Sequence, residues 1–274
     1  ISALAGSLAM VSANAIEYTM SGGMQVVYTT ADSPSGAQAD NGKGIGSATD
    51  LGFNASGELD NGYTVGYFMS VDTDNALTNT SAQLTVGMGS LGTLQYNNEF
   101  GSKANGIDDI TPHAYNETWD GLTTGAGTTV ANTNNPSFFG SGTASGSIDY
   151  RIPAQEYMGT TINASVTYDP NAGVGAATKA GVAGVGDSGS GTAYTLQLAH
   201  ESGVEVGGGI EMLKDAQGLL LSDSTESTTA YVKYAMGGLS AAYQVAYQDV
   251  RSGTGVEGAD KDADFMSVAY TYGD

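Results

Sequence analysis

Apolar and polar residues alternate with a period of two along most of the chain after residue 15. In the first such segment, residues 16–28, the even positions hold aromatic or aliphatic side chains and one glycine, and the odd positions up to Gln25 hold polar or small residues. This period predicts β-strands whose two faces meet different surroundings. About twelve segments repeat the pattern, which predicts an all-β fold. They cover residues 16–28, 51–59, 63–71, 82–88, 94–96, 148–152, 162–168, 194–198, 204–212, 230–236, 239–247 and 266–272.

Formal charges are confined to one face of these predicted strands. The apolar positions carry none, and the opposite positions carry Glu58, Asp149, Arg151, Glu205, Glu211 and Lys233. An Arg or Lys on a lipid-facing wall near mid-bilayer costs about 2–4 kcal/mol, which accounts for such a segregation. We therefore predict that the six charged residues face an aqueous lumen. We also expect arginine to impair insertion at Val86 or Val232 and to be tolerated at Gln83 or Gln244.

The connections between predicted strands alternate between short and long. Residues 60–62, 90–92, 201–203 and 237–238 form tight turns, and the turn over 154–159 is slightly longer. Long polar segments fall between them, at 31–49, 72–79, 97–146, 169–191, 214–227 and 249–263. A soluble β-sandwich has no reason to place every short turn at one end. A transmembrane antiparallel up-and-down barrel has short periplasmic turns and long external loops, so the asymmetry favours a barrel.

Composition supports the barrel and excludes other classes. Only 14% of the residues are charged, while the chain has 41 glycines, 16 tyrosines and no cysteine. Since no run of roughly 18 apolar residues follows residue 15, a membrane helix is excluded and a barrel remains. The net charge of −21 would repel phosphate backbones, so nucleic acid is not an expected partner.

The first fifteen residues resemble the end of a secretory signal. They are small and apolar and close on Ala13-Asn14-Ala15, which fits an A-x-A cleavage site. We therefore predict a signal-peptide remnant over residues 1–15 and an exported barrel domain over residues 16–274.

The order of segments resembles the general porins of Gram-negative bacteria. The resemblance is carried by the mature start IEYTMSGGMQVVY, the alternating strands, and the long loop after the fifth strand, EFGSKANGIDDITPHAYNETWDG. It implies a water-filled barrel of about sixteen strands whose third external loop folds inward. It also implies a homotrimer in outer-membrane lipid that passes small polar solutes and ions by passive diffusion.

Two features depart from that family. The ending at Gly273-Asp274 is typical of a tight turn rather than a terminal strand, so we expect about four C-terminal strands beyond this sequence. Family members usually line the wall opposite the constriction loop with arginines. Here the corresponding positions hold Gln25, Gln83 and Gln95.

The loop over residues 97–146 is too long for an ordinary connection. Its Ile110, Tyr115, Trp119, Phe138 and Phe139 are side chains that would anchor it inside a barrel, so we predict that it folds inward. A surface flap is the alternative. We predict that Asp108, Asp109, Glu117 and Asp120 form the pore constriction. With only 8 basic residues against 29 acidic ones, the channel is expected to prefer cations.

No set of residues predicts an enzyme. His113 and His200 have no partner pattern for a catalytic triad or a metal site. The G-x-G-x-x-G match at residues 184–189 lacks the preceding buried strand and the following helix that phosphate binding requires. No cofactor is expected.

Two acidic loop segments allow weak calcium binding. Asp72 and Asp74, and the run Asp260, Asp262 and Asp264, offer oxygen ligands but lack the glycine and glutamate of an EF-hand loop. An exported all-β surface or adhesin protein with calcium-binding acidic loops therefore stays as the alternative function.

Overall fold

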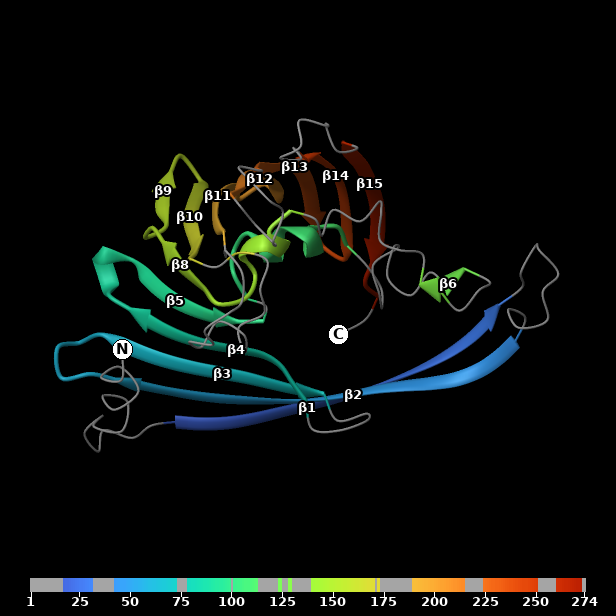
Figure 1. The fold of residues 1–274 in the computed structure, drawn as a ribbon, viewed down its shortest axis with the longest axis horizontal. Helices are drawn as coiled ribbons and strands as arrows, with labels where there is room; N and C mark the ends of the chain where they lie inside the picture. The colour runs from blue at the N-terminus through green and yellow to red at the C-terminus, as the bar shows by residue number, and fades with distance from the viewer. Residues whose placement is uncertain are drawn as a thin grey trace.

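The computed structural model describes residues 17–31, 42–72, 78–99, 101–112, 123–124, 128–129, 139–170, 172, 189–214, 224–250 and 260–272. Within these ranges a 13-stranded antiparallel sheet dominates the fold. Figure 1 shows the sheet curving, so that β1–β4 lie along one side and β11–β15 along the other. Among the described strands, β1 and β15 form the two edges of the sheet.

The strands pair in the order of the sequence. Their bounds are β1 (Glu17–Ala31), β2 (Gly42–Glu58), β3 (Thr64–Asp72), β4 (Thr78–Gly87), β5 (Thr93–Asn98), β8 (Ser147–Arg151), β9 (Gln155–Tyr157), β10 (Thr160–Asp169), β11 (Ser190–His200), β12 (Val204–Lys214), β13 (Ser224–Met236), β14 (Leu239–Val250) and β15 (Lys261–Tyr270). All but the short β9, which pairs only with β10, follow one another along the sheet. Each of the segments predicted from alternation is a strand, which confirms the all-β antiparallel fold.

Some strands are longer than the alternation indicated. The pairing of β1 with β2 continues to Ala31 opposite Gly42, inside the segment 31–49 that was predicted to be a loop. Strand β13 begins at Ser224, also inside a predicted loop. Glycine, serine and threonine dominate these extensions, so they carry little of the hydrophobic contrast on which the prediction depended.

The short connections are where the sequence predicted them. The link between β2 and β3 spans Leu59–Tyr63, and a 3₁₀ turn, η3 (Gly89–Leu91), joins β4 to β5. Strands β11 and β12 are joined across residues 201–203, and β13 and β14 across Gly237 and Gly238. Because neighbouring strands are antiparallel, these turns share one end of the sheet, as in an up-and-down barrel.

The two faces of the sheet differ in exposure and polarity. In β14, Val245 is 40% exposed on the outer face, while the next residue back, Gln244, is fully buried on the inner face. The same outer face carries exposed Ile210, Val232 and Tyr243. The pattern changes near the start of β15. There Asp262 lies opposite the outward Tyr247 and Asp264 lies opposite the outward Val245, so both aspartates are on the outer face. The loop end of this face is therefore acidic rather than apolar.

No helix among the described residues has the length and apolarity to cross a membrane. The buried apolar cluster lies instead between the loop after β5 and the inner face of the sheet. It consists of Ala104, Ile107 and Phe139 from the loop and Ala193 and Tyr231 from the strands, with Ile110 packed against it.

Candidate channel constriction

The long loop between β5 and β8 is folded inward. Its described parts include the 3₁₀ turns η4 (Asn105–Ile110) and η6 (Ser141–Thr143). Gln244 of β14 donates its amide Nε2–H to the carbonyl of Ile107, across 3.0 Å and 137 positions of sequence. Since Gln244 is on the inner face, this contact places η4 inside the curve of the sheet. The prediction of an inward loop over a surface flap is confirmed for these residues.

The first part of the loop is attached to β5 and β8 through one carbonyl. Gln95 Nε2 donates to the Gly101 oxygen at 2.8 Å, and Arg151 Nη2 donates to the same oxygen at 3.2 Å. Gln95 also donates to Asn97 Oδ1, so it is held in place within β5. Two inward side chains thus fix the point where the loop leaves the wall.

Asp149 of β8 also binds the first part of the loop. Its carboxylate accepts hydrogen bonds from Arg151 Nε at 2.7 Å, from Thr167 Oγ1 at 2.7 Å and from the Lys103 backbone N–H at 3.3 Å. The side chain is completely buried. The buried carboxylate therefore connects Arg151 of the wall with Lys103 of the loop.

Glu211 of β12 holds the returning part of the loop. Its carboxylate accepts from the Gly140 N–H at 3.0 Å and from Thr143 Oγ1 at 2.9 Å. Glu211 is fully buried, and its register partners are the uncharged Ala193 and Ser227. An isolated buried carboxylate needs such donors, because an unsatisfied one would be strongly destabilising.

Packing is tight beside Glu211. Phe139 is only 1% exposed, and a Cβ atom on Gly209 would come within 2.5 Å of its ring. Gly140 has φ +76°, and a Cβ there would lie 2.5 Å from the backbone of Ala104. Glycine is therefore required at both positions: at 209 so that the Phe139 ring reaches the wall, and at 140 so that the two ends of the loop meet.

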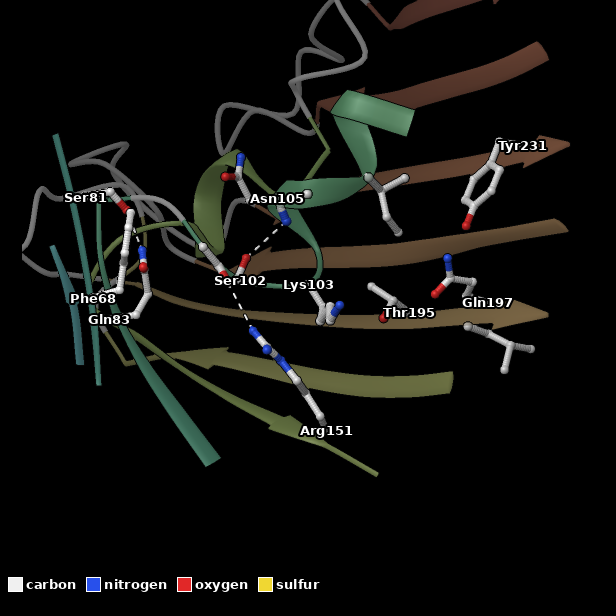
Figure 2. Close-up of a pocket in the computed structure, with 14 residues that line it drawn as sticks. Phe68, Ser81, Gln83, Ser102, Lys103, Asn105, Arg151, Thr195, Gln197 and Tyr231 are labelled. Carbon is white, nitrogen blue, oxygen red and sulfur yellow. Dashed lines mark hydrogen bonds between the residues drawn. The ribbon is translucent and has the colours of Figure 1, made fainter. Parts of the chain in front are cut away.

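A cavity of about 430 Å³ remains between the loop and the wall. Figure 2 shows Lys103 and Arg151 on one side of it, with Gln197 and Tyr231 further along. Of the described residues that line it, only Lys103 and Arg151 are charged. The lining residues are Phe68, Ser81, Gln83, Gly101, Ser102, Lys103, Asn105, Gly106, Ile107, Arg151, Thr195, Leu196, Gln197 and Tyr231.

The six predicted lumen residues occupy different environments. Arg151 lines the cavity, whereas Asp149 and Glu211 are buried beneath the loop. Glu205 lies opposite Lys233 in the strand register. Glu58 is exposed at the end of β2, away from the residues that line the cavity. The role of all six in conduction stays a prediction.

Half of the predicted constriction lies outside the described residues. Asp108 and Asp109 belong to η4, so the fold places their backbone inside the sheet. Glu117 and Asp120 are not among the described residues. Their joint action as a constriction stays a prediction.

Several residues that matter here were not predicted as site residues. Lys103 has no periodic signal because it lies in irregular backbone. Gln197, Tyr231 and Gln244 stand at inward positions of predicted strands, so alternation gave their face but not their contacts with the loop. Among the described residues, no group of three His, Cys, Asp or Glu side chains is placed to hold a metal ion. Calcium binding by the acidic loops stays a prediction.

A curved antiparallel wall that is apolar outside and polar inside, narrowed by an inward loop, defines an outer-membrane channel barrel. The sequence matches the Gram-negative porin family over residues 1–274, and the chain belongs to that family. This places the protein in the outer membrane of a Gram-negative bacterium, as predicted. The family consists of channels rather than enzymes.

One solved structure is similar enough to support the fold. The anion-selective porin from Comamonas acidovorans is 15% identical, with 92% of this chain and 74% of that chain covered and a TM-score of 0.60. OmpF of Salmonella typhi is 13% identical, covering 95% and 87% of the two chains, with a TM-score of 0.48. OmpT, an outer membrane protein of Vibrio cholerae, is 11% identical over 94% and 84%, with a TM-score of 0.47. No curated protein matches the chain in a sequence search.

Proposed function

We propose that this chain forms the wall of a water-filled channel for passive diffusion of small polar solutes and ions. The observation that carries the proposal is the inward loop, held by Gln95, Asp149, Glu211 and Gln244 on a polar inner face. A loop attached at several points narrows a passage, and a cavity of about 430 Å³ lies between the described part of the loop and the wall.

Conductance measurement tests this proposal. The purified protein, reconstituted in a planar bilayer, should give discrete ohmic steps and should release small neutral sugars from liposomes. Heat-denatured protein in the same detergent is the control. Absence of both steps and release in correctly folded, membrane-inserted protein would contradict a diffusion channel.

We further propose that the channel prefers cations. The support is the sequence balance of 29 acidic against 8 basic residues, together with the acids of the inward loop. The Comamonas porin shares the fold and is described as anion-selective, so the fold alone does not fix the sign.

Reversal potentials under a salt gradient test this preference. It should weaken as salt rises from about 0.01 M to 1 M, because the Debye length falls from roughly 30 Å to 3 Å. Changing Asp108, Asp109, Glu117 and Asp120 to Asn or Gln should reduce it further. Anion selectivity, or no effect of the four substitutions, would overturn this part of the proposal.

We also propose a homotrimer embedded in lipid, on the basis of the family. Sedimentation in detergent, with the detergent mass subtracted, should give three copies. The same preparation separates the channel from an exported surface protein, because a barrel requires detergent to stay in solution whereas a surface protein does not.

A further inference from the structure

The acids and bases near the inward loop are not equally available to a solute. Asp149 and Glu211 are buried and already accept hydrogen bonds from the loop. Lys103 is exposed, and Arg151 keeps 27% of its side chain exposed. A solute entering the cavity therefore meets two positive groups at this end, where both neighbouring carboxylates are buried. The partly buried Glu205 lies at the other end, beside Gln197 and Tyr231.

Both bases line the same cavity, and each is bonded to Asp149. Arg151 uses Nε on Asp149 and Nη2 on the Gly101 carbonyl, which fixes the plane of the guanidinium. Its Nη1 has no hydrogen-bond partner among the described residues. Lys103 is tied to the same Asp149 through its backbone N–H, so its side chain starts beside the guanidinium. A fixed guanidinium and a neighbouring ammonium suit an oxyanion such as a carboxylate.

The opposite part of the cavity offers an acceptor. The Tyr231 hydroxyl donates its hydrogen to Glu205 Oε1 at 2.9 Å, so its oxygen is left to accept. Gln197 Nε2 donates to the same Glu205 oxygen at 2.8 Å, and the amide oxygen of Gln197 accepts from Asn163 Nδ2 at 3.5 Å. A hydroxyl group of a solute would therefore find its acceptor in the Tyr231 oxygen.

We propose that this cavity is a transit subsite for small hydroxylated carboxylates, with the carboxylate on Lys103 and Arg151 and a hydroxyl on Tyr231. The inference rests on the proposed channel function and names a solute class for it. The volume of the cavity lies within the range of about 300–1,000 Å³ that small-molecule sites occupy. Lys103 and Arg151 would bind a carboxylate only by direct contact. The loop acids act over a longer range on small ions, so a cation preference of the channel is compatible with this site.

Three polyols that share a six-carbon chain and differ mainly in charge test the proposal. Gluconate is anionic, glucitol is neutral and N-methylglucamine is cationic. Each is titrated into the channel in KCl, and the half-saturation concentration for reduction of the single-channel current is measured. We expect gluconate to occlude the channel at the lowest concentration, and we expect Lys103→Met to raise that concentration on the order of tenfold. Lys103→Arg should restore it.

Lys214→Met is the matched control, because it removes the same charge at the end of β12, outside the cavity. Equal weakening by Lys103→Met and Lys214→Met would show that total charge acts rather than this site, and would overturn the proposal. Equal occlusion by gluconate and glucitol in a conducting channel would also overturn it. Absence of any conductance in the unsubstituted protein would instead contradict the proposed channel itself.

Discussion

The outer and inner faces of β12–β14 are built from alternate residues of the same strands, yet they meet opposite requirements. Outside, Ile210, Val232 and Val245 are each about half exposed without water-binding groups, which suits lipid. Inside, Glu211 and Gln244 are fully buried and bonded to the loop. Whether a side chain suits the outer face therefore depends only on its residue type, whereas on the inner face it depends on the groups to which the side chain is bonded. Substitutions should reveal that difference.

The largest effect is expected on the outer face. Val232→Arg places a charge on the lipid side at a cost of about 2–4 kcal/mol, so most of the protein should fail to insert. The folded fraction can be measured from heat-modifiable migration in detergent gels. Gln83→Arg is the control, because Gln83 lines the cavity and an added charge there reaches water. Equal loss in both variants would remove the distinction between the faces.

The structure restricts this control to Gln83. Alternation alone also predicted that arginine would be tolerated at Gln244. However, Gln244 is fully buried and bonded to both Ile107 and Thr229, so a longer charged side chain has no room there. An inward position is tolerant only where the loop does not cover it.

An intermediate effect is expected at Glu211. Glu211→Ala leaves the Gly140 N–H without its acceptor and the Thr143 hydroxyl with only the 3.5 Å contact to the Gly140 carbonyl. We expect this loss to cost about 1–3 kcal/mol. The barrel should still insert, but the loop should loosen, seen as noisier single-channel current and faster proteolysis near residue 140. Glu211→Gln keeps one acceptor oxygen, so its current noise should lie between that of the unsubstituted protein and that of Glu211→Ala. Quiet, wild-type current in Glu211→Ala would show that this carboxylate does not hold the loop.

The smallest effect is expected at Gln244. Gln244→Ala removes two neutral hydrogen bonds, to Ile107 and to Thr229. Only the bond to Ile107, worth about 0.5–1.5 kcal/mol, holds the loop, so current noise should increase only slightly. Combining it with Glu211→Ala tests whether η4 and η6 are held as one unit. A noise increase in the double variant beyond the sum of the single variants would indicate coupling. Strict additivity would mean that the two attachments act independently.

Much of the fold was predictable because strand periodicity and turn chemistry are local properties. The strands that follow one another along the sheet were found from alternation, and the turns at residues 201–203 and 237–238 from short glycine-containing links. The short β9 was missed, because residues 154–159 were predicted to be a turn. Extensions such as Gly42–Thr49 in β2 were missed because glycine and small residues carry little hydrophobic contrast. The pairing with β1, which is not local, makes them strands.

The inner face shows where sequence reasoning ends. Alternation determined that Asp149, Glu211 and Gln244 point inward, and composition together with loop lengths determined a barrel with a long loop after the fifth strand. Only the tertiary structure decided that the two acids hold the loop and that Lys103 and Arg151 line the cavity. The physical reason is that the alternation of side chains along a strand, a property of a few consecutive residues, determines which face of the sheet a side chain is on. The groups that it meets lie 71 positions away for Glu211 and Gly140 and 137 for Gln244 and Ile107, and irregular backbone sets their positions.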